Sequence, residues 1–234
     1  MTSASSSRAF RANHVQIARA VFAAIAAIMV TFSPDHSAVV GMAVFSGFAI
    51  ATGIVHLLAV WLVYPAGLRW PSLALGVVTL LAGMIASLGP VRTVTGFYAV
   101  VVTWALVSGL IEVLSGWAAL RRARPTRPAP VKSGHVEPWS DGTPAATMPR
   151  GQARDAVVTG VLGLILGVAT LCVPAGYALS YTVEAAQATF TLTGITIAVG
   201  LFGGYAAIVA VYLGIAGFSP RPAVTPAASE KEPV

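Results

Sequence analysis

Charged residues are scarce in this chain. Only 9% of its 234 residues are Asp, Glu, Lys or Arg, whereas 56% are hydrophobic. A soluble globular domain carries roughly 25% charged residues. A soluble chain of this length would therefore lack the polar surface that covers a core. Lipid tails solvate apolar side chains directly, so the composition predicts an integral membrane protein.

Cysteine is nearly absent, and the motifs of common enzyme classes are missing. The single cysteine, Cys172, excludes an intramolecular disulfide and a cysteine-cluster metal site. The four histidines are scattered, and the chain has neither a phosphate-binding glycine loop with lysine nor a His-Glu-x-x-His signature. We expect no metal, no cofactor and no enzymatic activity.

The net charge is +6, yet the basic residues lie at the ends of apolar runs and are not interleaved with aromatics. This distribution argues against a nucleic-acid partner.

Six apolar runs are each about as long as a membrane crossing, which needs roughly 20 residues. The first, third and fifth are short, and the second, fourth and sixth are long. The predicted fold is all-α, a polytopic membrane protein with six transmembrane helices. The runs are Gln16–Phe32, Ala38–Val63, Ser72–Leu88, Thr95–Leu120, Ala156–Val173 and Ala188–Phe218.

These runs divide the chain into five segments. Residues 1–15 form an N-terminal segment, 16–120 carry the first four helices, and 155–218 carry the last two. Between them, 121–154 is rich in Pro, Gly and charge and has no apolar period, so it is predicted to be a flexible linker. Residues 219–234 form a similar tail.

The basic residues predict the orientation. If the N-terminus is cytoplasmic, all 14 Lys and Arg residues except Arg92 fall on the cytoplasmic side. Cytoplasmic loops carry the Lys/Arg excess. We therefore expect a multi-pass protein of the bacterial cytoplasmic membrane with both termini and the linker inside. The alternative for the first run is a cleaved signal peptide, because Arg8 and Arg11 precede it, although no convincing small-residue cleavage site follows.

The sequence predicts an internal repeat of helix pairs, with chance alignment of apolar helices as the alternative. A shift of 56 residues places the first pair on the second without a gap, and a shift of 84 places the third short helix on the second. To align the third long helix with the second, about eleven extra residues must be inserted after Pro174. The predicted fold is thus three hairpin repeats. The matched residues are Pro34, Pro90 and Pro174; Gly53, Gly109 and Gly204; Gly83 and Gly167; Trp61, Trp117 and Tyr212; and His56 with Glu112.

Each matched residue type has a structural role in a membrane helix. A proline just past a short helix ends it, because the residue before proline disfavours the α conformation. The glycines Gly53, Gly109, Gly83, Gly167 and Gly204 are predicted to allow close helix packing. The aromatics Trp61, Trp117 and Tyr212 are predicted to anchor the long helices at the membrane interface.

The pattern resembles a known family. A short helix with spaced glycines, a proline turn and a long helix reading Trp104-Ala-Leu-Val-Ser-Gly109-Leu-Ile-Glu112, ended by Arg121-Arg122, looks like the membrane repeat of the HdeD-type acid-resistance proteins. The match is best over 72–122. The long linker and the longer last pair depart from that pattern. The resemblance implies six spans in three pairs and a role in acid or envelope stress; it supplies no catalytic residues.

Glu112 is the most informative single residue, because a carboxylate inside an apolar run costs about 2.5–3.5 kcal/mol on insertion scales. Its repeat mate is His56, and the third copy has Ala207. One hypothesis is a proton-sensitive pair of His56 and Glu112, whose charge would change when acid enters the cytoplasm. The other is a satisfied polar contact of Glu112 with a Ser, Thr or Trp. Arg19 is expected to snorkel to the interface, with a partnership to Glu112 as the alternative.

Other polar and small residues have ordinary explanations. Asp35, His36, Arg92 and Glu184 fall on the outer side, where solvated loop charge is expected and sensing of external pH is the alternative. Cys172 is expected to be a small packing residue.

Three functional hypotheses remain open. The first is a non-enzymatic membrane protein that supports acid or envelope-stress tolerance through lipids, other membrane proteins or further copies of itself. The second is a small proton-linked channel or transporter. Repeats of one orientation, and no proline in the middle of a span, disfavour it. The third is an accessory subunit of a membrane complex.

Overall fold

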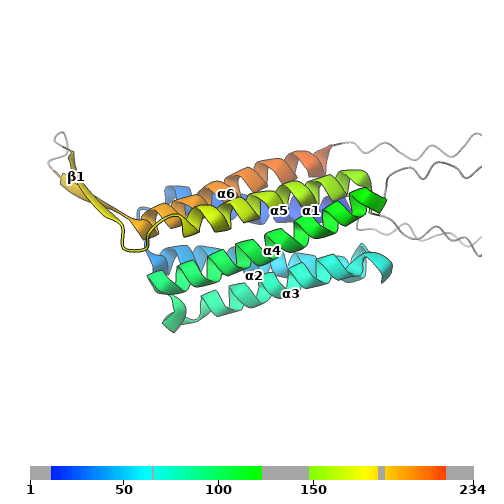
Figure 1. The fold of residues 1–234 in the computed structure, drawn as a ribbon, viewed down its shortest axis with the longest axis horizontal. Coiled ribbons are helices and arrows are strands. Elements are labelled where there is room, and N and C mark those ends of the chain that lie inside the picture. The colour runs from blue at the N-terminus through cyan, green and yellow to red at the C-terminus, as the bar shows by residue number, and fades with distance from the viewer. Residues whose placement is uncertain (1–11, 65, 123–147, 184–187, 220–234) are drawn as a thin grey trace, which may run out of the picture.

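We analysed a computed structural model, which describes residues 12–64, 66–122, 148–183 and 188–219. Six long helices dominate these residues (Figure 1). They are α1 (Ala12–Phe32), α2 (Ala38–Leu62), α3 (Arg69–Ser87), α4 (Val94–Arg122), α5 (Arg150–Leu171) and α6 (Gly194–Phe218). The short helices η1 (Ala66–Leu68) and η2 (Gly89–Val91) precede α3 and α4.

All six helices are long and apolar enough to cross a membrane, so by length and composition the chain is a multi-pass membrane protein. Helices α2, α4 and α6 are longer than helices α1, α3 and α5, as the sequence predicted. Of the predicted terminal segments 1–15 and 219–234, residues 1–11 and 220–234 lie outside the described residues, as does most of the linker; residues 12–15 belong to α1 instead. Arg121, Arg122 and Arg150–Arg154, which the sequence assigned to the linker, are helical.

The helices run side by side in alternating directions (Figure 1). We call the basic end of the bundle the end where α1, α3 and α5 begin and α2, α4 and α6 finish. Its described Arg residues are Arg69, Arg121, Arg122, Arg150 and Arg154. The opposite end carries the connections α1–α2, α3–α4 and α5–α6, and Arg92 lies there.

The closest helix contacts join neighbours from different predicted hairpins: α2 with α3, α4 with α5, and α1 with α6. Glycine permits two of these approaches directly. A Cβ on Gly53 would lie 2.8 Å from the Leu80 backbone nitrogen, and one on Gly109 would lie 2.7 Å from the Gly160 carbonyl oxygen. Backbones this close gain dispersion contacts that larger side chains would prevent.

Gly83 and Gly167 occupy matching places in the same two interfaces. A Cβ on Gly83 would lie 2.8 Å from the Ile50 backbone nitrogen, and one on Gly167 would lie 2.7 Å from the Leu106 side chain. Position 106 is 56 residues after 50, and 167 is 84 residues after 83, so the two contacts are related by the shifts of the predicted repeat.

Gly204 differs from the prediction. It is exposed, and a Cβ there would meet no chain atom within 4 Å, so Gly204 does not pack helices within this chain. The neighbouring Gly203 does, because its Cβ would lie 2.6 Å from the Val30 side chain on α1. Alignment by sequence alone misplaced the third long helix. The buried residues of α6 match the buried residues of α4 at a shift of 101 residues, whereas the sequence alignment used a shorter one. The matching residues of α6 are Ala198, Phe202, Ala206, Val209 and Leu213.

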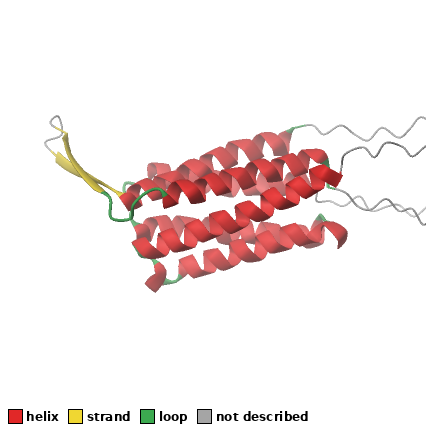
Figure 2. Cartoon of the chain, in the orientation of Figure 1, coloured by secondary structure: helices red, strands yellow, loops and turns green. Residues whose placement is uncertain are grey.

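The intervening residues form a β-hairpin that the sequence did not predict (Figure 2). Strands β1 (Ala178–Val183) and β2 (Ala188–Thr193) pair antiparallel, with Tyr181 opposite Phe190. The sixth helix therefore begins at Gly194 and not at Ala188. Alternating β-branched and aromatic residues such as Tyr181, Thr182, Thr189 and Thr191 favour extended backbone. Thr193 then caps α6 by accepting a hydrogen bond from the Thr196 N–H at 3.4 Å.

The core holds a cluster of aromatic side chains from α2, α4 and α6. Phe45 and Phe48 each meet the ring of Trp104 and the ring of Phe202 edge to face, with centroids 5.1–5.8 Å apart. Tyr205 meets Trp104 at 5.9 Å. Such edge contacts stabilise aromatic pairs beyond the area they bury. We refer to these five residues as the aromatic layer.

Candidate functional site

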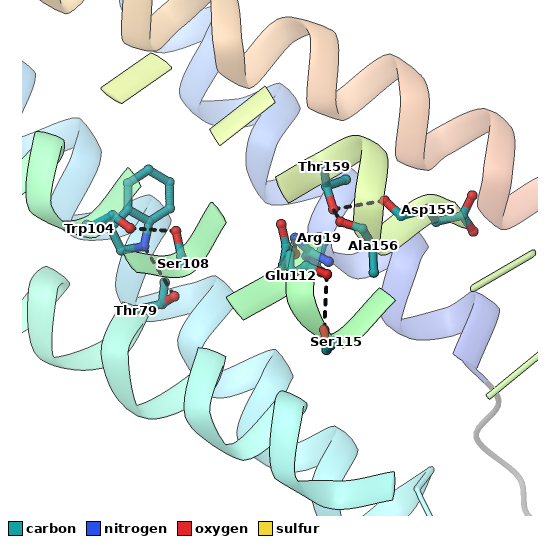
Figure 3. A network of polar contacts seen from close by, with 9 residues as sticks. All are labelled: Arg19, Thr79, Trp104, Ser108, Glu112, Ser115, Asp155, Ala156 and Thr159. Atoms are coloured by element: carbon teal, nitrogen blue, oxygen red, sulfur yellow. Dashed lines mark hydrogen bonds and ion pairs between the residues drawn. The ribbon is translucent and has the colours of Figure 1, made fainter. Parts of the chain in front are cut away.

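An ion pair lies inside the bundle between α1 and α4. The guanidinium Nη2 of Arg19 donates to Glu112 Oε1 at 2.7 Å (Figure 3). The side chains are 17% and 6% exposed. Glu112 is ten residues from the end of α4, about 15 Å at the ordinary rise per residue. A charge buried at this depth requires a counter-charge, and Arg19 and Glu112 are the counter-charges of each other.

The sequence expectation for Arg19 is therefore wrong in its preferred form. Arg19 lies near the start of a span, but its guanidinium does not extend to the interface; it binds Glu112. The alternative, a partnership between these two residues, is correct. The residues are 93 positions apart, and no local pattern indicates that α1 and α4 present them to each other.

His56 borders the same space but is not the direct partner of Glu112. Its side chain is buried, and no hydrogen bond or ion pair of the described residues joins the imidazole to the carboxylate. The backbone carbonyl of His56 accepts a hydrogen bond from the Ser72 hydroxyl at 2.9 Å, which ties α2 to α3. The predicted direct pair is thus replaced by a group of three, in which Arg19 binds Glu112 and His56 lies beside them.

A second acidic residue, Asp155 on α5, lies nearer the basic end. It accepts hydrogen bonds from the Gln16 side-chain amide and, at 3.1 Å, from the Tyr212 hydroxyl. These contacts join α1, α5 and α6. The sequence reasoning missed Asp155 because it lies just after the predicted linker, where a solvated charge is ordinary.

Two adjoining cavities connect these groups. The larger has a volume of about 70 Å³ and is bordered by Gln16, Arg19, His56, Ser72, Glu112, Ser115 and Asp155, with Met148 and Gln152 at the basic end. The smaller has a volume of about 20 Å³ and is bordered by Thr52, Thr79, Trp104, Ser108 and Tyr205. Arg19, His56, Leu75 and Glu112 border both. A cavity needs roughly 10–15 Å³ to hold a water molecule, so both have room for water.

Hydroxyl groups surround the smaller cavity. The indole N–H of Trp104 donates to the Thr79 hydroxyl at 3.2 Å, and the Ser108 hydroxyl donates to the Trp104 carbonyl at 2.6 Å (Figure 3). Thr52 donates to the Phe48 carbonyl at 2.7 Å. Hydroxyls held in this way keep acceptor lone pairs available to a further donor.

The predicted interface anchors lie toward the basic end but differ from one another. Trp61 and Trp117 are 77% and 52% exposed, and the Arg121 guanidinium stacks 5.1 Å from the Trp117 ring centroid. Tyr212 is only partly exposed, and its hydroxyl binds Asp155. It therefore takes part in the polar interior, whereas the two tryptophans face outward.

The residues predicted for the outer side lie away from the charged group. Asp35 accepts from the backbone N–H and the hydroxyl of Ser37, and so orders the turn between α1 and α2. Cys172 is exposed at the end of α5, contrary to the expected packing role. Glu184 lies outside the described residues. Within the described part of the chain, no three His, Cys, Asp or Glu side chains are grouped so that they could hold a metal ion.

No protein-family model, no curated protein and no solved structure matches this chain.

Proposed function

We propose that this chain is a non-enzymatic protein of the bacterial cytoplasmic membrane, similar to the HdeD type, that supports tolerance of acid or envelope stress. In this proposal the basic end faces the cytoplasm, the helices form three related hairpins, and the buried group of Arg19, His56 and Glu112 responds to protons. The bilayer is its immediate partner.

The observation that carries the proposal is the Arg19–Glu112 ion pair at 2.7 Å beside His56. Ionisable groups within membrane spans are costly, and by default they mark a functional site. A carboxylate and an imidazole can both gain a proton as the cytoplasm acidifies. Neutralisation of the Glu112 carboxylate would remove the charge that binds Arg19 and so alter the contact between α1 and α4.

Repeat geometry supports the resemblance. The closest approaches at Gly53 and Gly109, and at Gly83 and Gly167, recur at the sequence shifts of 56 and 84 residues. The shift of 56 residues relates His56 on α2 to Glu112 on α4, and both border the same two cavities. At the shift that fits burial, the third equivalent is Leu213, which is buried and apolar, and not Ala207.

Survival at acidic pH tests this proposal. A strain that lacks the protein would be complemented with the wild type, Glu112→Gln or the control Asp35→Asn, an acidic residue in an exposed turn. We expect Glu112→Gln to lose protection and Asp35→Asn to keep it. Equal survival of all three strains, at equal abundance in the membrane, would contradict the proposal.

A proton-linked channel or transporter is the second candidate, favoured by two cavities that both border the ion pair. Proton flux into liposomes measures it directly. Flux in the wild type that Glu112→Gln removes would support transport. A wild type without flux would leave the stress-tolerance role as the better proposal.

A further inference from the structure

The two cavities around the ion pair begin at the basic end of the bundle. The larger cavity reaches the basic end at Met148 and Gln152, where α5 begins. The smaller continues from the ion pair toward the middle of α2, α3 and α4, at Thr52, Thr79 and Ser108. Ser108 and Glu112 are one helical turn apart on α4. Polar groups therefore follow the bundle axis from the basic end to roughly its centre.

The aromatic layer ends this polar path. Phe48, Trp104 and Tyr205 border the smaller cavity on the side away from the ion pair. Phe45 lies behind them in edge contact with Trp104, and Phe202 in edge contact with Phe48; both are fully buried. Fully buried apolar side chains that lie beyond these rings include Met42, Phe97 and Val101.

Titratable or charged groups border the path from most of the packed elements. Arg19 comes from α1, His56 from α2, Glu112 from α4, Asp155 from α5 and Tyr205 from α6. Helix α3 contributes the hydroxyls of Ser72 and Thr79, and the α2–α3 connection contributes the phenol of Tyr64. Among the described residues, these groups do not include three His, Cys, Asp or Glu side chains placed to hold a metal ion.

We propose that the two cavities form a blind proton-uptake site, open to water at the basic end and sealed by the aromatic layer. This inference rests on the proton-responsive group of the proposed function and names its ligand as the hydrated proton. A hydronium ion that enters donates a proton to a carboxylate or imidazole and leaves a water molecule behind. The proton departs by the same route, so the protein binds protons without transporting them.

The seal makes the proposal testable by gain of function. Phe45→Ala combined with Trp104→Ala removes one ring from each side of the layer. Its matched control is Phe32→Ala combined with Trp61→Ala, the same residue types at positions 80% and 77% exposed. Purified proteins in liposomes with an internal pH dye and a potassium-clamped potential would report proton leak. We expect the wild type and the control variant to show no proton leak. The Phe45→Ala and Trp104→Ala variant should leak protons at least tenfold faster, and adding Glu112→Gln to it should lower that rate.

Two results would overturn the inference. One is a wild type that conducts protons as fast as the double variant, because the layer would then not be a seal. The other is a double variant that is monodisperse, helical by circular dichroism and still leak-tight. If the alanine variant does not fold, Phe45→Leu with Trp104→Leu removes less volume and faces the same two criteria. Acid survival of Glu112→Gln is independent of this leak, so failure of the proposed function and failure of the seal are distinguishable.

Discussion

Removing one partner of the buried ion pair should destabilise the protein strongly. Glu112→Gln leaves the Arg19 guanidinium inside the bundle without a counter-charge. Breaking a buried pair in this way costs about 3–5 kcal/mol, whereas an exposed pair is worth about 0–1 kcal/mol. Glu112 is only 6% exposed, but Arg19 retains 17% exposure and borders a cavity with room for water. We therefore expect a loss of about 3 kcal/mol, at the lower end of the buried range.

A double-mutant cycle separates the pair from its two members. Arg19→Met and Glu112→Leu together remove both charges and replace them with apolar side chains that the bundle can pack. Because no unpaired charge remains, the double variant should be more stable than either single variant. The assay is reversible unfolding in mixed micelles, followed by circular dichroism, with Arg122→Gln at the exposed end of α4 as the control. Single variants within about 0.5 kcal/mol of the wild type would refute this reasoning, because the ordinary range for exposed substitutions would then apply.

Two further predictions concern packing and orientation. Gly109→Ala should destabilise the α4–α5 contact, since its Cβ would lie 2.7 Å from the Gly160 carbonyl oxygen, whereas Gly204→Ala should be tolerated; equal unfolding midpoints would contradict the packing geometry. Cys172 is exposed at the end opposite the basic end, so a membrane-impermeant maleimide added to intact spheroplasts should label it, and labelling only after lysis would reverse the proposed orientation.

Composition and periodicity determined the membrane class and the six helices of this chain. Apolar runs long enough to span a bilayer are a local property, because backbone hydrogen bonds within lipid are satisfied inside each helix. For the same reason the predicted ends of α1, α2 and α4 lie within a few residues of the observed ones. Pro34 and Pro90 also act locally, by disfavouring helix at the residue before them.

The partners of the buried charges were decided only by the tertiary structure. The sequence identified Glu112 as a buried polar residue and His56 as its repeat mate. It could not indicate that α1 lies next to α4 with Arg19 at the depth of Glu112, because that contact depends on the packing of six helices. The hairpin at 178–193 was missed for a related reason. Its strands mix apolar residues with Ser and Thr, and their extended conformation is stabilised by pairing between β1 and β2, which no local pattern indicates.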